Sequence, residues 1–146
     1  AHDRADGAVV VQALRAVPSS PSAYIMSFTP AFPYQWVLDP RTGACLEEGY
    51  LLDTPCEQPA VSPHMHGAPA RFAYAHALSS AGGPVTQYAC PREMPRIDRV
   101  IKIDLERRVI AGEYAMPPKR ILVSEPTFVP KVGAPDPAEG GREDAG

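Results

Sequence analysis

Short runs of apolar residues, each bounded by turn-forming residues, follow one another along the chain. The run at residues 8–15 contains three consecutive valines, and Tyr24–Phe28 ends shortly before Pro30. Residues 71–77 alternate with the period of two that is typical of a half-buried strand. No stretch has the periodicity of an amphipathic helix. The pattern therefore predicts an all-β fold of short strands joined by loops.

Two similar hairpins are predicted. Residues 34–46 contain an apolar run, a turn at residues 39–43 and a second short run. Asp and Pro suit the first two positions of such a turn, and Gly suits the last. Residues 100–110 repeat the pattern, and aligning Asp39 with Asp104 superposes two strand–Asp–turn–strand units 65 residues apart (104 − 39). Antiparallel hairpins recurring at this period indicate β-propeller blades.

Other stretches complete the prediction. Residues 50–53 are expected to form a strand and residues 79–84 a loop. Ile121–Val123 is a short apolar run with the character of a buried strand. Residues 133–146, rich in Gly and charge, are expected to be a loop that is mobile when the chain is truncated. Because a small isolated β piece would leave long strand edges unpaired, we expect a fragment of a larger domain.

Composition narrows the class of protein. A hydrophobic content of 45% and a charged content of 21% are typical of a globular chain, and 18 prolines among 146 residues favour loops and strands over helices. The net charge of −3 argues against nucleic-acid binding. No apolar run is long enough to span a membrane. Three cysteines and no visible secretory signal fit a reducing compartment, so we do not expect secretion.

Two carboxylates lie in apolar surroundings beside prolines. Glu125 is followed by Pro126 and stands between Val123 and Phe128, and Glu57 lies two residues before Pro59. A carboxylate in such surroundings must be exposed, paired or hydrogen-bonded. Both residues could simply be surface turn residues. Alternatively, both could accept hydrogen bonds from metal-binding imidazoles and orient them.

Other candidate sites are weaker. His64 and His66 would project from one face of a strand, and with Cys56 nearby a zinc site is conceivable. The flanking Pro63 and Gly67 instead favour a solvated loop. The chain contains no Gly-rich phosphate loop and no serine nucleophile elbow.

The motifs resemble those of the carotenoid cleavage oxygenases. Residues 124–131, Ser-Glu-Pro-Thr-Phe-Val-Pro-Lys, followed by Gly133-Ala134 and by Glu143–Gly146, are similar to that family's Glu-Pro-x-Phe-Val-Pro-Arg, Gly-Ala and Glu-Asp-x-Gly elements. Four upstream segments match in family order, so that the resemblance covers roughly residues 6–146: residues 36–43, 56–63, 71–75 and 100–104.

The resemblance implies a fold and a reaction. The family fold is a seven-bladed β-propeller, of which residues 1–146 would form about two to three blades. Four histidines bind Fe(II) on its axis, and glutamates hold three of those histidines. The family adds O2 across a double bond of a lipophilic polyene, a carotenoid or apocarotenoid, and releases two carbonyl products. We expect the complete protein to be such a dioxygenase and the excised chain to be inactive.

The resemblance also implies roles for individual residues. Glu57 and Glu125 match the glutamates that hold iron-binding histidines, and Phe128 is a candidate for packing against the substrate. The histidine ligands are expected outside residues 1–146, one just before Ala1 and one beyond Gly146. His2, His64, His66 and His76 fall where the family has no ligand, so this chain itself is expected to contain no catalytic residue.

Alternatives remain open. Gln58, Ala60 and Ser62 depart from the family's apolar residue, Arg and Asn, which motivates a second hypothesis: a non-catalytic propeller that serves as a binding or scaffold module. Other members act on stilbenoids or retinoids. We expect a cytoplasmic or plastid location, and the resemblance allows peripheral membrane contact. The sequence does not predict the oligomeric state.

Overall fold

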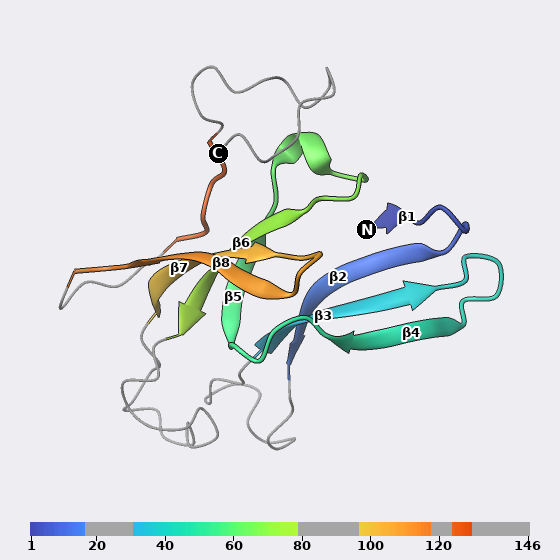
Figure 1. Ribbon diagram of the computed structural model, residues 1–146, viewed down its shortest axis with the longest axis horizontal. Helices are drawn as coiled ribbons and strands as arrows, with labels where there is room; N and C mark the ends of the chain where they lie inside the picture. Colours follow the sequence, from blue (N-terminus) through green and yellow to red (C-terminus); the bar gives the residue numbers. More distant parts are fainter. Residues whose placement is uncertain (17–30, 79–96, 118–123, 130–146) are drawn as a thin grey trace.

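The computed structural model describes residues 1–16, 31–78, 97–117 and 124–129 (Figure 1). These residues contain eight strands and one 3-10 turn, and no α-helix, so the all-β prediction is confirmed. No helix in this part of the chain is long and apolar enough to cross a membrane. The elements are β1 (His2–Asp3), β2 (Val9–Ala16), β3 (Ala31–Leu38), β4 (Cys45–Tyr50), β5 (Cys56–Ala60), η1 (Pro63–Met65), β6 (Phe72–Leu78), β7 (Ile97–Asp104) and β8 (Val109–Ala115).

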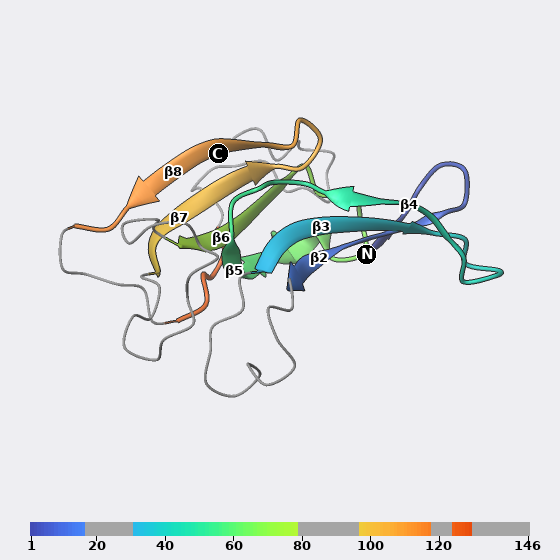
Figure 2. The same ribbon diagram turned by 90° about the horizontal axis from the view of Figure 1, so that it is seen from below.

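The strands form two four-stranded antiparallel sheets. One sheet has the order β1-β2-β3-β4 and the other has the order β5-β6-β7-β8, so each strand pairs with its neighbour in sequence. Figure 2 shows the two sheets as separate units, with β5 on the side of β2 and β3. Four-stranded meanders of this kind are the units from which propeller blades are built.

The predicted 65-residue repeat is present in the backbone. A β-bulge interrupts the β3–β4 pairing between Val37 and Leu38, and a second interrupts the β7–β8 pairing between Lys102 and Ile103, 65 residues later. Gly43 and Arg108, also 65 residues apart, both have positive φ angles, of 73° and 55°. The two hairpins therefore share turn and bulge geometry.

The ends of the two hairpins correspond as well. The Leu51 N–H donates to the carbonyl of Pro33 over 2.8 Å, and the Met116 N–H donates to the carbonyl of Asp98 over 2.7 Å. Both pairs lie at the same offset. The prediction of a strand at residues 50–53 is wrong beyond Tyr50, because Leu51 leaves the sheet after this bond and enters the core, where it is buried.

The turn residue Arg108 gives a direct test of the repeat. A left-handed backbone is unfavourable for a residue with a Cβ and costs glycine little. We expect Arg108→Gly to raise the free energy of unfolding by up to about 1 kcal/mol, reduced by the greater freedom of glycine in the unfolded chain. The converse change, Gly43→Ala, should lower it by about 1 kcal/mol, although a Cβ there would meet open space. Urea unfolding of both variants measures this, and an unchanged Gly43→Ala variant would contradict it.

The main core lies on the face of the β5–β8 sheet that meets the other sheet. Strand β6 places three alanines on this face and Phe72, Tyr74 and His76 on the other. Leu14 of β2 packs against the core, and the small alanine side chains let the two sheets approach closely. The buried members are Leu51, Cys56, Ala73, Ala75, Ala77, Ile101, Ile103 and Leu105.

The strand predicted near residues 8–15 and the strand at residues 71–77 are confirmed as β2 and β6. Tyr24–Phe28, residues 79–84, Ile121–Val123 and residues 133–146 lie outside the described residues. His64 and His66 flank the centre of the short turn η1 and are exposed, as the prediction of a solvated loop required.

Candidate functional site

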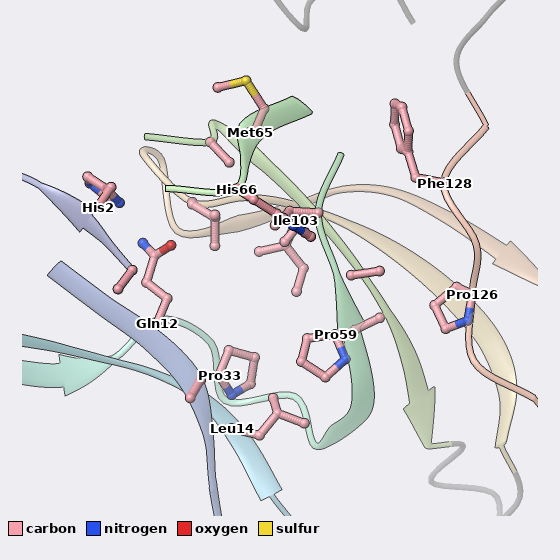
Figure 3. A pocket seen from close by; sticks show the side chains of 18 of the residues that line it. His2, Gln12, Leu14, Pro33, Pro59, Met65, His66, Ile103, Pro126 and Phe128 are labelled. Atoms are coloured by element: carbon pink, nitrogen blue, oxygen red, sulfur yellow. The ribbon is translucent and has the colours of Figure 1, made fainter. Parts of the chain in front are cut away.

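A pocket of about 570 Å³ opens where the two sheets meet (Figure 3). Its wall is largely apolar, and it is built by residues of β1, β2, β5, β6 and β7 together with residues 61–70 and 126–128. Gln12 and Leu14 of β2 face Pro59 of β5 across the opening, and Phe128 lies on the far side. The segments that carry Glu57 and Glu125 therefore border the same pocket.

Glu57 lies on β5, the first strand of its sheet. Its neighbour Cys56 lines the pocket, and across the strand pair it stands opposite His76. The side chain is half-buried, and burial raises the pKa of the Glu57 carboxyl above its usual value. No described residue donates a hydrogen bond to it. A desolvated carboxylate without a donor is suited to accept a hydrogen bond from an N–H group.

The backbone next to Glu57 is strained. Gln58 has a φ of 51°, and the β5–β6 pairing shifts between Glu57 and Ala60. A non-glycine residue in this region costs about 1–3 kcal/mol, and bulges beside functional sites redirect the neighbouring side chains. The sequence gave no signal for this bulge, because glutamine has no preference for a left-handed backbone.

Glu125 is exposed and directly precedes the part of its segment that enters the pocket. Pro126, Thr127 and Phe128 line the wall, and the Phe128 ring lies 5.9 Å from the ring of Tyr74 on β6. This ring contact places the segment against the β5–β8 sheet. No described contact joins Glu125 to Glu57.

Within the described residues, no three His, Cys, Asp or Glu side chains lie close enough to hold a metal ion. The zinc site conceivable from Cys56, His64 and His66 is therefore not formed, because the two histidines are exposed while Cys56 is fully buried in the core. Glu57 fits the part of an acceptor that orients a metal-binding imidazole, but the described residues supply no ligand set.

Cys56 gives a prediction of chemical reactivity. Burial, and secondly the charge of Glu57, raises the pKa of the Cys56 thiol to about 12. At pH 8 roughly one thiol in ten thousand would be ionised, so alkylation of the folded chain should spare Cys56. Exposed Cys45 is the internal control and should be modified. Peptide mapping after iodoacetamide treatment tests this, and equal labelling of the two residues would contradict it.

Sequence reasoning assigned no function to His76 or Asp104, which are both buried polar residues. The Asp104 carboxylate accepts the Arg107 backbone N–H at 2.9 Å and the Arg71 guanidinium at 3.2 Å, and these bonds lower the pKa of Asp104. Asp104 thus closes the β7–β8 turn. Its alignment with Asp39, which accepts the Arg41 N–H in the other hairpin, was the available signal.

Comparison with known proteins places these features in a family. The family model RPE65, retinal pigment epithelial membrane protein, matches residues 3–146. No curated protein matches the chain in a sequence comparison.

Solved structures match the fold. The cobalt-substituted apocarotenoid oxygenase of Synechocystis is 20% identical with a TM-score of 0.64, and covers 92% of this chain. A mutant of the same oxygenase is 20% identical with a TM-score of 0.65, and covers 92% of this chain. A chimera of apocarotenoid oxygenase and RPE65 is 19% identical with a TM-score of 0.64, again over 92% of this chain.

The chain matches 27% of the length of each of the first two structures and 28% of the chimera. The two sheets therefore correspond to part of the carotenoid oxygenase propeller, and the predicted fold class is confirmed. Together with the family match over residues 3–146, this shows that the chain belongs to the RPE65 family of carotenoid cleavage oxygenases.

Proposed function

We propose that this chain is part of a non-haem Fe(II) dioxygenase that cleaves a double bond of a carotenoid or apocarotenoid with O2, giving two carbonyl products. The observation that carries the proposal is Glu57, a half-buried carboxyl group without a hydrogen-bond donor among the described residues, beside an apolar pocket. Family membership supplies the context for that observation.

In this proposal the residues of the chain orient and enclose. The Glu57 carboxylate accepts the N–H of one iron-binding imidazole and fixes its ring orientation, and Glu125 does the same for another. Pro59, Pro126 and Phe128 offer an apolar wall that suits a lipophilic polyene and excludes water. The metal, when bound, supplies the activation of dioxygen.

The experiment is a cleavage assay of the complete protein. It is supplied with Fe(II) and a panel of carotenoids and apocarotenoids under ¹⁸O2, and products are separated by chromatography and mass spectrometry. We expect two labelled carbonyl products from one substrate, and none when dioxygen is removed. Polyene binding without product, in protein shown to contain iron, would contradict the proposal.

One observation favours the alternative of a non-catalytic binding module. Ser62, which departs from the family motif, is buried with a hydroxyl group that no described residue hydrogen-bonds. Gln58, a second departure, carries the strained backbone. A module of this kind would bind a polyene with unchanged absorption and consume no dioxygen. Stilbenoids and retinoids belong in the same panel, because cleavage or isomerisation of these would identify a different substrate within the family.

A further inference from the structure

Two polar side chains face each other across strands β5 and β6. Glu57 on β5 is paired directly with His76 on β6, so the two side chains project from the same face of the sheet. The strands lie next to one another in Figure 1. Directly opposed residues of an antiparallel pair have Cβ atoms about 4.5–5.5 Å apart, which is within reach of a Glu and a His side chain.

Both groups lack a partner among the described residues. His76 is 2% exposed, and nothing described hydrogen-bonds its Nδ1 atom. Burial lowers the pKa of the His76 imidazole, whereas burial raises the pKa of the Glu57 carboxyl. A buried polar atom without a hydrogen bond is costly, so a partner for Nδ1 is expected. The opposed carboxylate is that partner once the half-exposed Glu57 side chain changes rotamer.

We propose that the His76 Nδ1–H group donates a hydrogen bond to the Glu57 carboxylate and thereby fixes its orientation. His76 is then a positioning residue, and the second carboxylate oxygen stays available for an imidazole N–H. That consequence rests on the proposed function, whereas the pairing itself requires no metal. The sequence resemblance assigns no role to His76.

Other charged groups near His76 define the control. Its partner on β7 is Val100, and the charged residues two positions to either side are Asp98 and Lys102. Asp98 Oδ1 is also buried without a hydrogen bond from a described residue, at 4.0 Å from the Arg99 Nε atom. However, the register shifts between Ala77 and Leu78, so Asp98 is not opposed to His76. Glu57 is the directly opposed carboxylate.

The test is NMR of the full 146-residue chain without metal. Long-range ¹H–¹⁵N correlation of wild type gives the tautomer, and titration gives the His76 pKa in wild type, Glu57→Gln and the matched control Asp98→Asn. We expect a protonated Nδ1 in the neutral ring, and a lower His76 pKa in Glu57→Gln, since the variant lacks the anion that stabilises the imidazolium. Asp98→Asn should leave the His76 pKa closer to wild type.

Two results would overturn the pairing. One is a neutral His76 protonated at Nε2 in wild type, which needs no variant to fold. The other is a fall of the His76 pKa in Asp98→Asn but not in Glu57→Gln, which would assign the imidazole to Asp98. Because no iron is present, failure here is distinct from failure of the proposed function, which the cleavage assay decides.

Discussion

Replacing Ile101 with alanine is expected to lower the free energy of unfolding by about 2–5 kcal/mol. Ile101 is fully buried at the centre of the β5–β8 sheet, between Ala75 on β6 and Glu113 on β8. It belongs to the core that joins the two sheets. Since its alanine neighbours cannot expand to fill the space, the variant should lose both the transfer free energy and the packing of the removed atoms.

Ile110 on β8 is the matched control, because it is 37% exposed and lies in the same hairpin. Ile110→Ala should cost well under half as much as Ile101→Ala, and urea unfolding with both variants at one temperature gives the comparison. Equal losses would contradict the placement of the core on the face that meets the β1–β4 sheet.

The second large effect concerns Glu57. In the complete protein, Glu57→Gln should weaken metal binding about 10–100-fold, the usual effect of removing a carboxylate that holds a metal-binding histidine. The side chain keeps its size but loses the negative charge that orients the imidazole and increases its basicity. Titration with Co(II), followed by its visible spectrum, measures the affinity without turnover.

Glu106→Gln is the matched control for this change of charge. Glu106 is an exposed turn residue of the β7–β8 hairpin whose nearest cation, Arg71, lies 3.9 Å away. We expect its metal affinity to equal that of the wild type. An unchanged affinity in Glu57→Gln would show that Glu57 serves no metal-binding imidazole, even if the protein binds iron.

The hairpins could be predicted because their signals are local. Asp39 and Asp104 accept backbone N–H groups inside their turns, and Gly43 supplies the left-handed residue that the turn needs. At Arg108 the same geometry occurs without a glycine, so composition alone would not have found it. The alignment of the two aspartates reached it through the repeat.

The site could be predicted less completely, for physical reasons. Proline and apolar neighbours pointed to Glu57 and Glu125, and motif resemblance gave them a role. The bulge at Gln58 and the burial of His76 depend on how strands β5 and β6 pair, which is a non-local property. Leu51 left its predicted strand because the core, rather than local preference, determines its place.

Iron analysis of the purified complete protein tests the central claim most directly, with the 146-residue chain measured beside it. The account predicts stoichiometric Fe(II) in the complete protein and no stoichiometric Fe(II) in the chain, because the described residues contain no cluster of metal-binding side chains. A complete protein that takes up no iron would contradict the oxygenase. Stoichiometric Fe(II) in the 146-residue chain would contradict the placement of the ligands outside it.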